Sequence, residues 1–265
     1  MIRWLALAVA MVAYTATAGA APASVLQKVS VDEHVGERIP LDLAFTSTSA
    51  RRVELGTLFD GRRPVLMVLT YVRCKMLCSL VLRGAIDAVR AMPLELGRDY
   101  RVVMVSIDPG EDVASAAARR ADTVAQLGRG PDADWTYLVG AERPIHALAD
   151  ALGFRYTFDR RTEQFAHPAV IFVLTPDGRI ARYLHGVRFE PWVLAAALQS
   201  AARGEATAGA THEAVLSCFL FDPALRAHRT LIERYLQIGG AIVMGALITL
   251  IALLVLWERR RRRRT

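Results

Sequence analysis

The sequence predicts an α/β fold, in which helices cover a central sheet of mainly parallel strands. Three observations lead to this prediction. Short apolar runs rich in Val and Leu alternate with segments whose apolar residues recur at helical spacing. This alternation occurs three times between residues 64 and 152, and a hairpin and a last helix follow it. Such an order gives parallel neighbouring strands and then an antiparallel pair.

The first predicted strand and helix enclose two cysteines. Residues 64–71 form an apolar run typical of a strand buried on both faces, and residues 79–92 have helical spacing. If the chain is already helical from Cys74, then Cys74 and Cys78 lie one turn apart on one face. The positive helix N-terminus and Lys75 would then lower the pKa of such thiols. The pair can close a disulfide, hold a soft metal ion or alternate between the two; two small buried hydrophobic residues are the structural alternative.

The elements after the cysteine helix are each predicted by a local signal. Asp112 can cap a helix, with Ser115 in its first turn, while Pro144 opens and Gly153 closes another. The turn Pro176-Asp177-Gly178 lies between two apolar runs and is a strong hairpin signal. In chain order the predicted elements are a strand at 100–108, a helix from Val113 to about Leu127, a strand at 135–139, a helix at 144–152, extended stretches at 155–158 and 164–165 about a polar turn, paired strands at 169–174 and 180–184, and a helix from Glu190 to about Ala202.

The part of the chain before the first buried strand gives weaker signals. Residues 21–50 are mixed and polar, and they predict an irregular lead-in with one edge strand near Leu41–Phe45. Residues 53–59 alternate briefly between apolar and polar side chains. From residue 51 to residue 203, the order of elements, with cysteines at the start of the first helix, is that of a thioredoxin-like fold. We therefore predict a thioredoxin-like domain at 51–203.

Both ends of the chain carry signals for membrane traffic. Arg3 and the apolar run from Trp4 to Tyr14 precede small residues, which is the plan of a secretory signal peptide at 1–20; an uncleaved anchor is the alternative. Residues 238–257 contain no charged side chain, and about 20 residues of helix span about 30 Å, so they predict a transmembrane helix. A linker and juxtamembrane segment at 204–237 leads into it.

The basic tail at 258–265 sets the expected orientation. Its six arginines, Arg259–Arg264, belong in the cytoplasm by the positive-inside rule, so we expect the thioredoxin-like domain on the periplasmic, outer face of the cytoplasmic membrane. A nucleic-acid-binding tail is the weaker alternative. Arg3, Glu258 and these arginines account for +6 of the net charge of +7. The remaining +1 over residues 21–237 gives no electrostatic reason to expect nucleic acid.

The cysteines and one histidine are the candidates for chemistry. Cys74, Cys78 and Cys218 are too few for a disulfide scaffold, and their odd number leaves at least one thiol unpaired or intermolecular. His167 lies just before the predicted hairpin. In a thioredoxin-like sheet the loop before this strand packs against the cysteine loop, so we expect His167 close to Cys74 and Cys78. A lone histidine is more often a solvated or core residue, and that alternative stays open.

Four segments, taken together in their order and spacing, carry a family resemblance. They are Thr70-Tyr-Val-Arg-Cys74-Lys-Met-Leu-Cys78, Val105-Ser-Ile-Asp-Pro-Gly-Glu-Asp112, Trp135-Thr-Tyr-Leu-Val-Gly140, and His167 before Val173-Leu-Thr-Pro-Asp-Gly178. On these segments, which span about residues 50–200, the chain resembles the Sco/SenC family of copper-handling assembly proteins. The resemblance implies copper on Cys74, Cys78 and His167, and a role in maturing the dinuclear copper centre of haem–copper oxidases. Lys75 stands where the family often has proline, and commoner members have an N-terminal membrane anchor.

Five further residues have open roles. Asp108 and Asp112 follow the second predicted strand, where helix capping is the simplest role; the resemblance suggests that Asp108 could also lie near the metal and accept a hydrogen bond. Cys218 is either a buried structural cysteine or an accessory thiol near the membrane surface. His212 and His228 flank it at spacings that fit no common ligand motif.

The leading functional hypothesis is a membrane-tethered copper metallochaperone. Two thiolates select Cu(I), and one imidazole completes a three-coordinate site. The implied partners are the oxidase subunit that carries the copper centre and a thiol-reducing protein, since an oxidising compartment would close the dithiol. The competing hypothesis is a thiol–disulfide oxidoreductase that keeps the cysteines of an exported partner reduced through Cys74 and Cys78. Exchange chemistry needs no imidazole, so His167 separates the two hypotheses. A scaffold that only binds assembly partners would leave the dithiol and the histidine unexplained.

Overall fold

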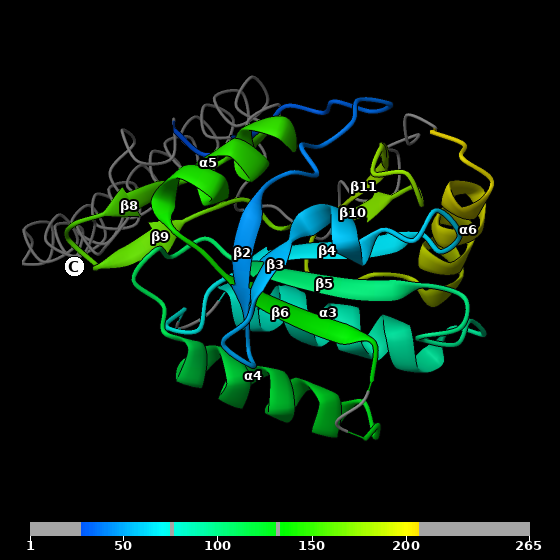
Figure 1. Ribbon diagram of the computed structural model, residues 1–265, viewed down its shortest axis with the longest axis horizontal. Coiled ribbons are helices and arrows are strands. Elements are labelled where there is room, and N and C mark those ends of the chain that lie inside the picture. Colours follow the sequence, from blue (N-terminus) through cyan, green and yellow to red (C-terminus); the bar gives the residue numbers. More distant parts are fainter. Residues whose placement is uncertain (1–27, 75–76, 131–132, 207–265) are drawn as a thin grey trace, which may run out of the picture. The chain divides into compact units, whose positions relative to one another are not determined.

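A computed structural model describes residues 28–74, 77–130 and 133–206 (Figure 1). The predicted signal peptide, the transmembrane helix at 238–257, the basic tail and nearly all of the segment at 204–237 lie outside the described residues. Within the described ranges, no helix is both long enough and apolar enough to cross a membrane.

The described chain forms an α/β fold around one mixed sheet (Figure 1). The pairs β4–β5 and β5–β6 are parallel, and the outer pairs are antiparallel. This confirms the predicted parallel centre and the hairpin beside it. The spatial order is β11 (Ile180–His185), β10 (Val170–Leu174), β4 (Val65–Thr70), β5 (Arg101–Ser106), β6 (Trp135–Val139), β2 (Ala44–Ser47) and β3 (Arg52–Glu54).

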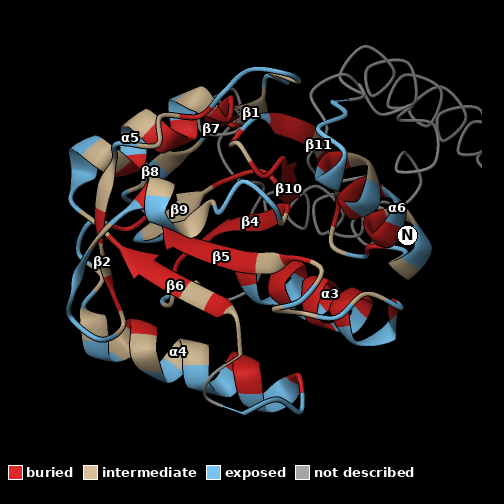
Figure 2. Ribbon diagram, turned by 45° about the vertical axis from the view of Figure 1, so that its right-hand side comes forward, coloured by how far each residue is buried: buried red, intermediate tan, exposed pale blue. Residues whose placement is uncertain are grey.

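Helices cover both faces of this sheet. Alternate residues of β4 point to opposite faces, so Leu66 and Val68 pack with one set of helices and Val65 and Met67 pack with the other. Figure 2 shows the central strands buried along nearly their whole length, as the continuous apolar run at residues 64–71 predicts. The first face carries α3 (Leu77–Ala91), α4 (Val113–Gln126) and α6 (Pro191–Ala202), and the second carries α5 (Glu142–Ala151).

The lead-in differs from the sequence prediction. Strand β2 lies inside the sheet between β6 and β3, not at its edge, and β1 (Ser30–Val31) pairs with β7 (Phe154–Arg155). The predicted domain start at residue 51 therefore falls inside the sheet. Local alternation did not predict these pairings because their partners lie about 90 to 125 residues further along the chain. Residues 53–59 form the end of β3 and a 3-10 helix at Leu55–Leu58.

Helix boundaries follow their local signals closely. Asp112 caps α4, and its Oδ1 accepts a hydrogen bond of 2.8 Å from the Ser115 amide. Helix α5 starts at Glu142, two residues before Pro144, and the chain after it turns at Gly153 with a φ of +60°. A Cβ atom at Gly153 would also overlap the backbone oxygen of Asp32, so both the positive φ and the close contact require glycine here.

The candidate site residues lie where β4 and β5 end. Parallel strands place their carboxyl ends at one edge of the sheet, so the loops after Thr70 and Ser106 are neighbours. A small hairpin of β8 (Thr157–Asp159) and β9 (Gln164–Ala166) leads into His167 and then β10. Because β10 is antiparallel to β4, its start lies at the same edge of the sheet.

Candidate metal centre

Two cysteines and one histidine meet at this edge of the sheet. Their potential ligand atoms, the Sγ atoms of Cys74 and Cys78 and a ring nitrogen of His167, lie within 4.8 Å of one another. The Cys78 Sγ is 2.8 Å from Nε2 of His167, and the Cys78 amide donates to the Cys74 Sγ at 3.1 Å. No disulfide joins the two cysteines in this structure. The structure therefore brings together the three residues that the sequence singles out.

Each ligand comes from a different local structure. Cys78 is buried in the first turn of α3, and His167 is buried just before β10. Cys74 is half-buried in the loop between β4 and α3, three residues before the helix begins. The helix thus starts later than an arrangement with both cysteines on one helical face would require. The contact between the cysteines is the hydrogen bond from the Cys78 amide, in the first turn of α3, to the Cys74 sulfur.

The hydrogen bonds of His167 determine which nitrogen of its neutral ring carries the proton. Nδ1 lies 2.9 Å from the Pro168 carbonyl oxygen, which can only accept, so Nδ1 carries the proton. In the neutral imidazole, Nε2 then presents its lone pair toward the Cys78 Sγ. This is the arrangement by which a ligating histidine is usually held for a metal.

Burial dominates the environment of Cys78. It raises the pKa of this thiol, and the nearby Cys74 raises the pKa further. The helix N-terminus is expected to lower the pKa of Cys78, but burial outweighs this effect, because desolvation destabilises the thiolate more than the helix dipole stabilises it. In the metal-free protein the Cys78 thiol is neutral and can donate to His167; metal binding would release its proton.

Aromatic side chains hold His167 against the end of β4. The Tyr71 ring meets the His167 ring edge-on at 6.1 Å between centroids, and the centroid of the Phe154 ring lies 5.9 Å from that of His167. The Tyr71 hydroxyl accepts from the Phe165 amide at 3.2 Å, which ties β9 to the cysteine loop. Burial raises the pKa of Tyr71, so this phenol stays neutral.

Asp108 reaches the cysteine loop through a neighbouring arginine. Its Oδ2 accepts from Arg73 at 2.6 Å from Nη2 and 3.2 Å from Nε, and its Oδ1 accepts from the Gly110 amide at 2.9 Å. The Asp108 side chain is 5% exposed, whereas that of Arg73 is 71% exposed. Asp108 thus fixes the residue directly before Cys74, and Asp112 is the helix cap.

Sequence reasoning missed Tyr71, whose ring meets that of His167. It also missed Glu111 and Arg119, whose side chains hydrogen-bond to the backbone of Val72 in the cysteine loop. Glu111 lies within a segment that carries the family resemblance, yet only its neighbours Asp108 and Asp112 received roles. Other histidines have structural partners: His185 lies 2.7 Å from Glu33, and His146 stacks on Tyr156. Cys218, His212 and His228 lie outside the described residues.

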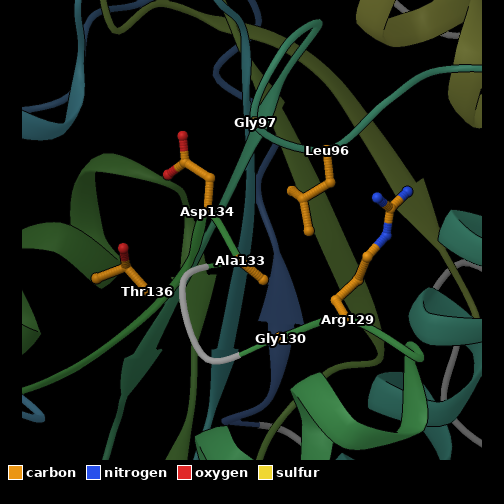
Figure 3. Close-up of a pocket in the computed structure, with 7 residues that line it drawn as sticks. All are labelled: Leu96, Gly97, Arg129, Gly130, Ala133, Asp134 and Thr136. Atoms are coloured by element: carbon orange, nitrogen blue, oxygen red, sulfur yellow. The ribbon is translucent and has the colours of Figure 1, made fainter.

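A separate pocket of about 550 Å³ lies at the opposite edge of the sheet, beside the start of β6 (Figure 3). Figure 3 shows Asp134 and Arg129 on opposite sides of it. The Asp134 carboxylate is paired with Arg63 at 2.8 Å and with Arg101 at 3.3 Å. This ion-pair network joins the starts of the strands and contributes no cysteine or histidine ligand.

Comparisons with known proteins identify a family and similar folds. The family model described as SCO1/SenC matches residues 39–203. No curated protein was found to match the chain. Among solved structures, a protein of Aquifex aeolicus VF5 described as a candidate electron-transfer protein superimposes with a TM-score of 0.57 and 22% identity, over 68% of this chain and 99% of its own.

Two further solved structures carry the Sco name. BsSco, described as a member of the Sco family of cytochrome c oxidase assembly proteins with a disulfide switch, has a TM-score of 0.50 and 19% identity, over 67% of this chain and 98% of its own. Arabidopsis thaliana ScoI, solved with copper bound, has a TM-score of 0.49 and 17% identity, over 64% of this chain and 99% of its own. The family match covers well over half of the sequence and includes all three residues of the cluster, so the chain belongs to the SCO1/SenC family.

Proposed function

We propose that this protein is a copper metallochaperone that carries one copper ion on Cys74, Cys78 and His167. One observation carries the proposal: the potential ligand atoms of two cysteines four residues apart and of a histidine 89 residues after the second converge within 4.8 Å of one another. Two sulfurs and one imidazole nitrogen form a soft donor set, which favours Cu(I) over hard cations such as Mg²⁺ or Ca²⁺. The lone pair of His167 Nε2 already points at this cluster. Copper is the cargo of such a protein.

We further propose that the acceptor is the subunit carrying the dinuclear copper centre of a haem–copper oxidase. Membership of the SCO1/SenC family supports this, since the family resemblance implies such a client. The partners would be that subunit and a thiol-reducing protein that keeps Cys74 and Cys78 open in an oxidising compartment.

The proposed location is the cytoplasmic membrane, with a single span at 238–257, the domain outside and the C-terminus in the cytoplasm. Its support is the apolar span, the arginine tail and the signal-peptide pattern of the sequence. A phosphatase fused after residue 210 should be active, and one fused after Thr265 should be inactive. The reverse pattern of activity would exclude this topology.

The second candidate function is a thiol–disulfide oxidoreductase. Its support is that Cys74 and Cys78 lie in contact, as exchange of a disulfide with a partner requires. His167 argues for the metal function, because thiol exchange does not need a buried imidazole with its lone pair directed at the cysteines.

A transfer assay separates the two functions. The copper-loaded full chain is mixed with an oxidase copper-binding domain whose own cysteines are already reduced. A metallochaperone passes copper to this acceptor, and the His167→Ala variant passes little. An oxidoreductase would pass no copper, and its metal-free form would reduce an oxidised acceptor equally well with His167 or with alanine. That second pattern would overturn the proposed function.

A further inference from the structure

The peptide at Val72, two residues before Cys74, is held from both sides by side chains of another segment. Its amide donates to Oε2 of Glu111 at 2.7 Å, and its carbonyl oxygen accepts from Nη2 of Arg119 at 2.9 Å. Glu111 lies in the loop between β5 and α4, and Arg119 lies on α4. We refer to these two contacts as the Val72 clamp.

Glu111 is itself fixed by several donors. Its Oε1 accepts from the Tyr137 hydroxyl at 2.5 Å, and its Oε2 also accepts from the Ser106 hydroxyl at 3.0 Å. The carboxylate is half-buried, and burial raises its pKa while these donors act in the opposite direction. Because Ser106 ends β5 and Tyr137 lies in β6, the clamp connects the cysteine loop to the centre of the sheet.

Cys74 is the ligand that most needs such support. Cys78 is held by α3, and His167 is held by its Pro168 hydrogen bond and the surrounding rings. Cys74 belongs to neither a helix nor a strand. Its sulfur accepts from the Cys78 amide at 3.1 Å, and its backbone is placed by the chain that runs from the end of β4. The Val72 clamp fixes that chain at its middle. A ligand that is misplaced by a fraction of an ångström binds its metal less tightly.

We propose that Glu111, together with Arg119, is a positioning residue for Cys74: it holds the thiol beside Cys78 and His167, where the three residues could bind copper, and it resists formation of a disulfide with Cys78. The inference rests on the proposed copper site. In the reduced protein the two sulfurs lie within 4.8 Å, whereas a disulfide requires about 2.05 Å. Disulfide formation therefore moves the two sulfurs together. Loss of the Val72 clamp would free the cysteine loop and make that movement easier.

Glu111→Gln tests this directly, because glutamine has nearly the same shape but a single acceptor atom in place of two. The full-length reduced variant should bind Cu(I) about 10- to 100-fold more weakly than the wild type in competition with a chromophoric chelator, the usual cost of losing a ligand's outer partner. In a fixed glutathione buffer without metal, a larger fraction of the variant should hold the Cys74–Cys78 disulfide. A purely structural role would lower the melting temperature and leave both quantities unchanged.

The neighbouring Asp112→Asn variant is the matched control, since asparagine also caps helices and Asp112 contacts Ser115, not the cysteine loop. It should leave Cu(I) affinity and the disulfide fraction at wild-type values.

If Glu111→Gln does not fold, Arg119→Gln removes the other half of the clamp and should change both quantities in the same direction. A folded clamp variant with wild-type Cu(I) affinity and disulfide fraction would overturn the inference. Failure of the wild type to bind Cu(I) would instead refute the proposed function. The disulfide fraction measured without metal would still show whether the Val72 clamp resists disulfide formation.

Discussion

Oxidation of Cys74 and Cys78 to a disulfide is expected to reduce copper binding from one ion per chain to nearly none. A mild thiol oxidant takes two electrons from the pair, two protons leave, and one S–S bond forms. Neither sulfur can then become the thiolate that binds Cu(I). His167 alone is a weak site for Cu(I). Equilibrium dialysis of the oxidised and the dithiothreitol-reduced full chain measures the difference.

Peptide mapping of the same samples identifies the bridge. We expect Cys74 joined to Cys78, because the Cys78 amide already contacts the Cys74 sulfur at 3.1 Å. The Cys218→Ser variant should therefore oxidise and lose copper just as the wild type does. Oxidised protein that keeps its copper, or a main bridge from Cys218 to either residue, would contradict this prediction.

Replacement of His167 should weaken Cu(I) binding by more than about 100-fold. Loss of a group that only supports a ligand already costs about 10- to 100-fold, and His167 is proposed as a ligand itself. His167 is buried, so alanine also leaves a cavity beside Phe154 and lowers stability. His167→Gln fills more of that space without supplying an imidazole, and it should show the same loss of affinity.

His185→Ala is the control for removing a partly buried imidazole. His185 is hydrogen-bonded to Glu33 and is not part of the cluster, so its loss should leave Cu(I) affinity unchanged. Chelator competition at a pH near 7 measures all three variants. Wild-type Cu(I) affinity in a folded His167→Gln variant would show that His167 is not a copper ligand.

The sequence predicts the parts of the fold that depend on local signals. Strand β4 is apolar at nearly every position because both of its faces are covered, and the β10–β11 hairpin is marked by its turn, where Gly178 has a φ of +83°. Strands β1 and β2 could not be predicted in the same way. They are short, and each pairs with a distant strand, although β2 also pairs with its neighbour β3.

The same division applies to the site. The proximity of the three cluster residues could be predicted from their positions in a thioredoxin-like order of elements, even though His167 lies 89 residues after Cys78. The protonation of Cys78 does not follow from sequence, because the position at a helix start is visible in the chain and its burial is not. The role of Glu111 is equally hidden, since nothing local links it to an amide 39 residues earlier.

X-ray absorption spectroscopy at the copper edge of the Cu(I)-loaded, reduced full chain tests the copper site most directly. We predict two sulfur neighbours and one imidazole nitrogen around each copper ion, with loss of the nitrogen in His167→Gln and of one sulfur in Cys74→Ser. A site with nitrogen and oxygen neighbours only, or a spectrum that is the same in the wild type and in these variants, would contradict copper binding by Cys74, Cys78 and His167.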